Sequence, residues 1–278
     1  MFIRSGTPGF DLCAAPVGHT TMGGLRDLYA SSVCYGLGAW SKANGLILNE
    51  TKTKCVIFHA PGSSTTLPDN IVLGPYKINI TSSIKTLGVI FTAQMSWNEH
   101  VSHVCSKVRK VVGVLNRNRS SLPFKVKRLI YHALFHSHLS YCFLIWGSTT
   151  AQNIQMLEIL QKKAIRAIAN VSFFEHTQEL FQQNRIIRVR DIYKFKTLLS
   201  YRNAMLGRLD SFLTLATLQE SRSTYSYRHQ APWQIPFSCT NYGCQRLKHT
   251  LPSLLNYFNQ QNVDVLSLNK TKILDLFL

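Results

Sequence analysis

Acidic residues are scarce in this chain of 278 residues. Asp and Glu together number 13 against 31 Lys and Arg, which leaves a formal net charge of +18 at pH 7. A charge of this size describes the partners of a protein rather than its fold, and it favours a polyanion. Nucleic acid is the partner that this charge favours most. The alternatives are an anionic membrane surface and a basic protein with no charged partner.

The marks of a secreted or membrane protein are also missing. The 7 cysteines are odd in number and scattered, and residues 1–25 contain no apolar run long enough for a signal peptide. No Asp, Glu, Lys or Arg occurs between Arg128 and Glu158, but histidines, serines and a turn at Gly147 interrupt this stretch, whereas a membrane-spanning helix needs about 20 apolar residues. We therefore expect reduced thiols and a cytoplasmic or nuclear protein that is not secreted and has no membrane partner.

The hydrophobic pattern changes along the chain and predicts an α+β protein. A small α+β part comes first, and from residue 97 onward the period of the apolar residues becomes helical. The expected regions are a poorly ordered N-terminus (1–24), the α+β part (25–96), a helical domain (97–206) and an irregular end with short helices (207–278).

Short elements are expected in the α+β part. A helical pattern over 25–44 ends at Asn44-Gly45, and a buried strand follows at 55–58. Residues 60–70 are rich in Pro, Ser and Thr and predict a loop. Residues 71–91 predict β structure that turns at Ser82-Ser83 and returns as a strand over 84–91.

Two of the predicted helices carry one apolar face and one basic face. Segment 101–115 places valines and a leucine on one stripe, and segment 153–169 repeats this design. The basic residues expected to project from the opposite faces, and therefore to contact nucleic acid, are Lys107, Lys110, Arg117, Lys162, Lys163 and Arg166. A mostly apolar helix over 124–146 is predicted between them, and a further helical segment follows at 177–206.

The stretch 40–58 has the pattern Trp-x3-Asn-Gly-Leu-x-Leu-Asn-x2-Lys-Thr-Lys-x-Val-Ile-Phe. It resembles the distal palm of reverse transcriptases of the non-LTR (LINE-type) retrotransposon family. Blocks in the same order as in that family continue to about residue 260, among them Ile84-Lys-Thr-Leu-Gly-Val89 and Leu160-Gln-Lys-Lys-Ala164. The resemblance implies a remnant palm with a primer-grip hairpin, followed by a helical thumb.

The resemblance also implies roles for single residues. Lys52 takes the place of the family's turn lysine, which lies near the pyrophosphate of the incoming nucleotide and neutralises charge or donates a proton there. Lys85, Leu87 and Gly88 take the place of the hairpin that grips the 3′ end of the primer. Thr86 departs from the family, which has an aromatic residue at this position.

The metal-binding aspartate pair of that family is not found in this chain. Nucleotidyl transfer uses two divalent ions held by carboxylates, yet Asp11, Asp27 and Glu50, the acids ahead of Lys52, are not adjacent to other acids. We therefore expect no polymerase activity from this chain alone, no catalytic residue and no bound cofactor, since Mg²⁺ is expected only for an intact family member.

Other hypotheses stay open at this stage. The cluster His132, His136, His138 and Cys142 suggests zinc, but no second cluster complements it, so we predict core histidines and no metal site. Instead of a nucleic-acid-binding fragment of a retrotransposon RNA-directed DNA polymerase, the chain is alternatively a helical protein-interaction module that uses the apolar window 129–146. A third alternative is a translated transposon relic with no selected function.

Overall fold

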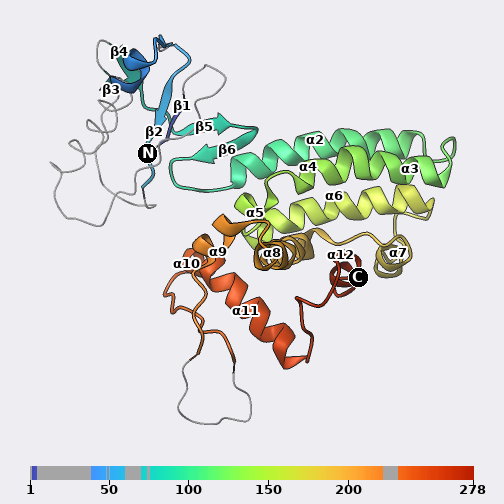
Figure 1. The fold of residues 1–278 in the computed structure, drawn as a ribbon. Helices are drawn as coiled ribbons and strands as arrows, with labels where there is room; N and C mark the ends of the chain where they lie inside the picture. The colour runs from blue at the N-terminus through green and yellow to red at the C-terminus, as the bar shows by residue number, and fades with distance from the viewer. Residues whose placement is uncertain are drawn as a thin grey trace. The chain divides into compact units, whose positions relative to one another are not determined.

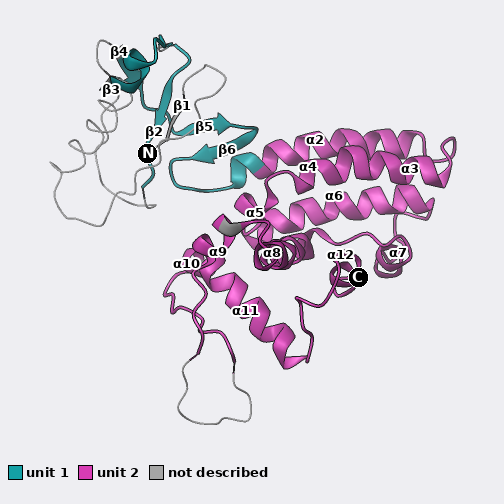
Figure 2. Cartoon of the chain, in the orientation of Figure 1, with its two compact units in different colours: residues 1–100 teal, residues 101–278 magenta. Residues whose placement is uncertain are grey.

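The computed structural model describes residues 2–4, 39–47, 49, 51–59, 70–73, 76–221 and 231–278. The chain divides into two compact units, residues 1–100 and 101–278 (Figure 2). The predicted poorly ordered N-terminus, apart from residues 2–4, lies outside the described residues, as do most of the helix predicted over 25–44 and nearly all of the loop predicted over 60–70.

Unit 1 contains short strands in antiparallel pairs. A helical turn over 39–43 ends at Asn44 and Gly45, and Gly45 takes a φ of 65°, which favours glycine. The strand pairs of the described residues are β1 (Phe2–Arg4) with β2 (Lys54–Val56), β3 (Asn70–Leu73) with β4 (Tyr76–Asn79), and β5 (Ser83–Thr86) with β6 (Val89–Thr92). The predicted strand at 55–58 is thus present, one residue earlier and shorter.

The single strand predicted over 84–91 is wrong. Leu87 and Gly88 take φ values of 47° and 84°, so the chain turns there and β5 pairs with β6, with Thr86 opposite Val89. A two-residue turn with positive φ at both central positions matches the twist of an antiparallel hairpin. The segment therefore forms the hairpin that the family resemblance implied.

Unit 2 begins with long helices whose apolar stripes form a core. In α2 (Asn98–Arg117) the predicted stripe is buried from Val101 to Leu115, both of which have no exposed surface. In α6 (Ala151–Ala169) Leu157, Ala164 and Ile165 are likewise buried. Figure 1 shows α2, the segment that follows it and α6 running alongside one another, so these stripes face inward, as the period predicted.

The single helix predicted over 124–146 is wrong, because the chain changes its winding at Tyr131 and the helix ends at Ser140, where Tyr141 is extended and Cys142 takes a φ of 48°. The segment forms α3 (Phe124–Ile130), the π-helix η1 (Tyr131–His136), α4 (Ser137–Ser140) and α5 (Phe143–Trp146). Tyr131, Phe135, Leu139 and Phe143 are four residues apart and all fully buried. Residues four apart on an α-helix drift round the axis by about 40° per step, and the wider π-turn reduces this drift.

A buried glutamine joins three elements of unit 2. The Gln161 amide nitrogen donates to the Tyr131 hydroxyl at 2.9 Å and to the Ile187 carbonyl at 2.8 Å, while its Oε1 accepts the Val189 backbone N–H at 3.0 Å. Val189 is the first residue of α8 (Val189–Met205), whose N-cap Arg188 gives no side-chain cap. Gln161 therefore supplies from α6 the cap that α8 lacks.

The C-terminal part of unit 2 packs on α8. The segment predicted over 177–206 is α7 (Gln178–Gln183) and α8, and the later helices are α9 (Asp210–Ala216), α10 (Asn241–Cys244), α11 (Leu247–Gln260) and α12 (Lys270–Asp275). Leu198 and Tyr201 of α8 share a core with Leu251 of α11 and Ile273 of α12. The predicted α+β class with a helical bundle is confirmed, and no helix among the described residues is both long and apolar enough to cross a membrane.

Candidate nucleic-acid interface

The turn that carries Lys52 is shaped by its neighbours. Asn49 accepts the Lys52 backbone N–H on Oδ1 at 3.1 Å, and the Asn49 carbonyl oxygen accepts the Thr53 hydroxyl at 2.7 Å. Thr53 is buried, whereas Lys52 is exposed. The Asn, Lys and Thr of the sequence pattern therefore have different roles. Asn49 and Thr53 stabilise the turn, and Lys52 is exposed to solvent.

The β5–β6 hairpin exposes the residues that the resemblance singled out. Lys85 and Gly88 are exposed, and Leu87 at the turn has 59% of its surface exposed. Ile84 and Thr86 alternate with Lys85 along the strand and are buried. Thr86, which replaces the family's aromatic residue, is thus on the covered side of the hairpin and adds nothing to its exposed surface.

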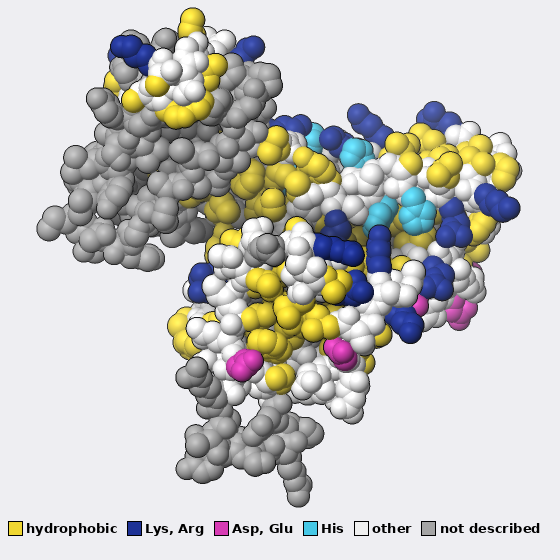
Figure 3. All heavy atoms as spheres, viewed as in Figure 1, with side chains coloured by type: hydrophobic (Ala, Val, Ile, Leu, Met, Phe, Trp, Pro, Cys, Tyr) yellow, Lys and Arg dark blue, Asp and Glu magenta, His cyan; other side chains and the backbone are white. Residues whose placement is uncertain are grey.

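The basic face predicted for α2 is confirmed. Lys107, Lys110 and Arg117 are all exposed, and their spacing of three and seven residues places them on one side of the helix. Glu99 in the first turn is the one acid of α2, so no carboxylate of this helix neutralises them. Figure 3 shows Lys and Arg side chains over the helices of unit 2 and few acidic ones on the face in view. A row of exposed cations of this kind suits phosphate contacts.

Lys162, which the sequence predicted to project away from α6, forms an ion pair within the protein. Its amino group lies 3.4 Å from a carboxylate oxygen of Glu158, one turn earlier on α6. Arg190 of α8 donates to both oxygens of the same carboxylate, at 2.7 and 2.6 Å. Burial raises the pKa of Glu158, but the hydrogen bonds and charge of Arg190, together with Lys162, bring the pKa below its ordinary value. Lys162 therefore pairs with a buried carboxylate, while 40% of its own side chain stays exposed.

Lys163 and Arg166 are also half-buried, and they face a hollow of about 180 Å³. We call this the α2–α6 hollow; its lining residues are Asn116, Arg119, Lys163, Arg166, Ala167, Val171 and Phe173. Arg119, in the turn after α2, and Phe173, in the loop after α6, were not among the candidates from sequence. The pair Phe173-Phe174 next to a basic helix end is the signal that marks this loop in the sequence.

Lys127 links two segments of the wall of this hollow. It is only 4% exposed, and its amino group donates to the carbonyl of Arg119 at 3.1 Å and to the carbonyl of Ala167 at 3.3 Å. Burial, followed by the charge of Arg119, lowers the pKa of the Lys127 amino group. Lys127 therefore positions two segments of the hollow wall and does not face a ligand.

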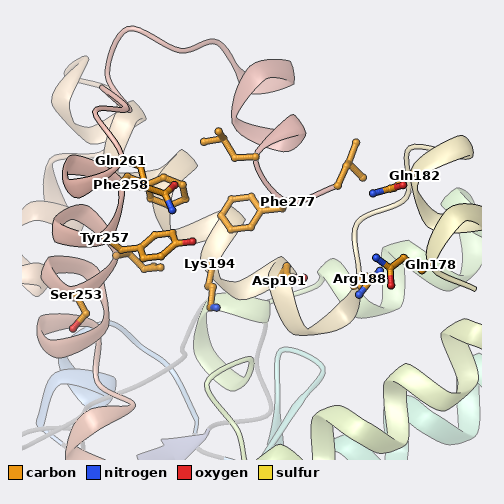
Figure 4. Close-up of a pocket in the computed structure, with 13 residues that line it drawn as sticks. Gln178, Gln182, Arg188, Asp191, Lys194, Ser253, Tyr257, Phe258, Gln261 and Phe277 are labelled. Carbon is orange, nitrogen blue, oxygen red and sulfur yellow. The ribbon is translucent and has the colours of Figure 1, made fainter.

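A larger hollow, of about 590 Å³, lies between α7, α8, α11 and the C-terminal residues. Figure 4 shows Arg188 and Gln178 close together at one end, Tyr257 and Phe258 at the other, and Phe277 between them. The acid Asp191 also lines it. Because its lining carries both charges and long apolar surfaces, this hollow lacks the uniform charge of a phosphate site.

The prediction that the histidine cluster lies in the core is wrong. His132 is exposed, and His136 and His138 are half-buried. Among the residues that the structure describes, no three His, Cys, Asp or Glu side chains come together in a way that would hold a metal ion. The acids ahead of Lys52, which are Asp11, Asp27 and Glu50, lie outside the described residues.

Comparison with known proteins gives one distant relation. Over 116 residues the chain is 24% identical to the RNA-directed DNA polymerase from mobile element jockey of Drosophila funebris, and the match covers 40% of this chain and 12% of that protein. No protein-family model and no solved structure matches the chain. The similarity relates the chain to reverse transcriptases of mobile elements, of which it spans a small fraction.

Proposed function

We propose that the chain is a piece of a retrotransposon-type reverse transcriptase that holds nucleic acid and does not polymerise on its own. Its partner is the backbone of RNA, DNA or an RNA–DNA hybrid, as in a template–primer. The observation that carries the proposal is the exposed basic row Lys107, Lys110 and Arg117, which no acid of α2 neutralises. The distant similarity to a polymerase gives this row a natural ligand.

The exposed positions of unit 1 support the same assignment. Lys52 is exposed at its turn, at the position where the resembled family has the lysine near the incoming nucleotide, and Lys85, Leu87 and Gly88 are the exposed residues of a primer-grip-like hairpin. A hairpin whose turn contains glycine allows a nucleic-acid backbone to approach closely. The five cysteines of the described residues are all free, in keeping with a cytoplasmic or nuclear setting.

Salt dependence tests the proposal directly. We expect the purified full chain to bind a labelled RNA–DNA hybrid with an affinity that falls steeply as salt rises, because each phosphate contact releases counterions. Changing Lys107, Lys110 and Arg117 together to Ala should weaken binding and lower the slope of log K against log salt by about one per contact removed.

A control variant removes the same charge elsewhere. Lys248, Lys270 and Lys272 lie on α11 and α12, and their joint change to Ala lowers the net charge by the same amount. The proposal requires this variant to keep the affinity and most of the slope. Equal losses in both triple variants would mean that the chain attracts nucleic acid by net charge alone.

One observation favours a second candidate, a helical protein-interaction module. Within the apolar window 129–146, Leu129 is 68% exposed and Leu134 is 48% exposed, and Ile145 is exposed as well. Such residues can form a contact surface for another protein. This function predicts a discrete complex that is insensitive to added RNA and is lost when Leu129 and Leu134 are changed to Ser.

A further inference from the structure

The α2–α6 hollow concentrates positive charge. Three of its lining residues, Arg119, Lys163 and Arg166, are cationic and none is acidic. None of the ion pairs among the described residues involves them. Cations held close together repel one another, and an anion placed among them relieves this repulsion. The hollow is several times larger than the roughly 30 Å³ that a water occupies in the liquid, so it has room for a larger anionic group.

The two arginines of the hollow are held in place. Arg119 donates from Nε to the Asn170 side-chain oxygen at 2.8 Å and from an amino group to the Val171 carbonyl. Arg166 donates from Nε to the Glu175 carbonyl at 2.9 Å. A guanidinium has five N–H donors, so each arginine is fixed by some of them and keeps others for a ligand. Donors fixed in this way lose little conformational entropy when an anion binds.

An exposed aromatic pair lies at the rim of the hollow. Phe173 lines the hollow beneath the Arg166 guanidinium, whose central carbon is 5.6 Å from the ring centroid. The Phe173 and Phe174 rings are 5.6 Å apart and nearly perpendicular, and Phe174 has 88% of its surface exposed. A ring exposed to this extent gains from a flat partner that covers its face, and every nucleobase offers such a face.

We infer that the α2–α6 hollow binds an unpaired nucleotide of a single strand, with its backbone phosphate among Arg119, Lys163 and Arg166 and its base stacked on Phe174. Within a duplex both faces of a base are covered by its neighbours, so an aromatic side chain stacks on unpaired bases. The inference rests on the proposed function, since it takes nucleic acid as the ligand. It adds to that function a preference for an unpaired strand. The basic row of α2 gives no such preference, because it contacts only phosphates and suits duplex and single strand equally.

Binding of a labelled oligothymidine by the full chain tests the inference, with the RNA–DNA hybrid measured in parallel. F174A and K163Q should each weaken oligothymidine binding, roughly tenfold for the loss of a stacked base. F174A should leave hybrid binding unchanged. Phe237 is 90% exposed and lies in another segment, so F237A is the matched control and should change neither affinity. In F174W the stacking is kept, and the added tryptophan emission should be quenched by oligothymidine.

The other outcomes separate this inference from the proposed function. Oligothymidine binding that F174A and K163Q leave intact, with hybrid binding still lost in the α2 triple variant, overturns the inference alone. An equal loss of hybrid and oligothymidine in F174A also overturns it, because stacking would then play no part. A folded chain that binds neither nucleic acid overturns both. Binding to anionic phosphatidylserine vesicles that depends on Phe174, without binding to oligothymidine, would assign the hollow to a membrane surface instead.

Discussion

Replacing Gln161 by Met should destabilise unit 2 strongly. Methionine has nearly the shape of glutamine and fills the same space, so the change removes hydrogen bonds without opening a cavity. Three groups lose their partner: the Tyr131 hydroxyl, the Ile187 carbonyl and the Val189 N–H. All three residues are buried, at 0%, 6% and 0% exposure, so solvent does not replace Gln161 readily.

The magnitude follows from these three groups. A buried polar group that loses its hydrogen bond costs about 1–3 kcal/mol, so Q161M should lower the free energy of unfolding by at least about 3 kcal/mol. This is a large part of the roughly 5–15 kcal/mol that stabilises a typical protein. Y131F removes a single partner, so it should cost about 1–2 kcal/mol and less than half as much as Q161M.

Urea unfolding followed by far-UV circular dichroism measures this difference. With a slope of about 2 kcal/mol per molar urea, a loss of 3 kcal/mol moves the midpoint down by about 1.5 M. Gln155 is exposed on the same helix, so Q155M is the matched control and should stay within about 0.5 kcal/mol of the wild type. A Q161M loss no larger than that of Y131F would refute the view that Gln161 caps α8 and joins the three elements.

Three further changes have expected outcomes. R190A leaves the Glu158 carboxylate, which is 7% exposed, with Lys162 at 3.4 Å as its remaining ion-pair partner. In urea unfolding R190A should lower the free energy of unfolding by about 1–3 kcal/mol, whereas K162A should lower it by under about 0.5 kcal/mol. Equal losses in the two variants would contradict this account. Burial and then nearby positive charges lower the pKa of His136 from 6.5 to about 4, so its neutral form is favoured in the folded state. The free energy of unfolding should therefore fall by at most about 3 kcal/mol as pH drops from 6.5 to 4. In H136Q the free energy of unfolding should depend less on pH over this range. Leu87 has a φ of 47°, so L87G should relieve strain in the β5–β6 hairpin. Amide hydrogen exchange in the hairpin should become slower, with the free energy of local opening raised by up to about 1 kcal/mol. Faster exchange would argue against strain there.

The sequence predicted those features that depend on one face of one element. The valines of α2 recur with a helical period, so the buried stripe and the exposed Lys107 and Lys110 follow from it. The turn at Asn44-Gly45 was also predictable, because glycine tolerates the left-handed conformation that ends a helix. In each case local chemistry and tertiary packing favour the same structure.

Some features of the basic helix α6 could not be predicted because they depend on residues far apart in the sequence. The ion pair of Glu158 with Lys162 has the spacing of one helical turn, but its stronger partner, Arg190, comes from another helix. The sequence made no prediction for Lys127, whose burial depends on the packing of α3 on α6. One of the three basic residues predicted on the outer face of α6, Lys162, is therefore already paired within the protein, which a periodicity argument does not detect.

The π-turn at Tyr131–His136 also affects how the chain tolerates changes in its length. Each π-type hydrogen bond spans one residue more than an α-type bond, so this helix accommodates one extra residue without extending its axis. A deletion of one residue on the exposed side, for example at Ala133, would restore regular winding and leave the flanking segments nearly where they are. In an alignment with related chains, a single-residue gap at this place is therefore compatible with an unchanged bundle, even though it falls in the middle of a helix.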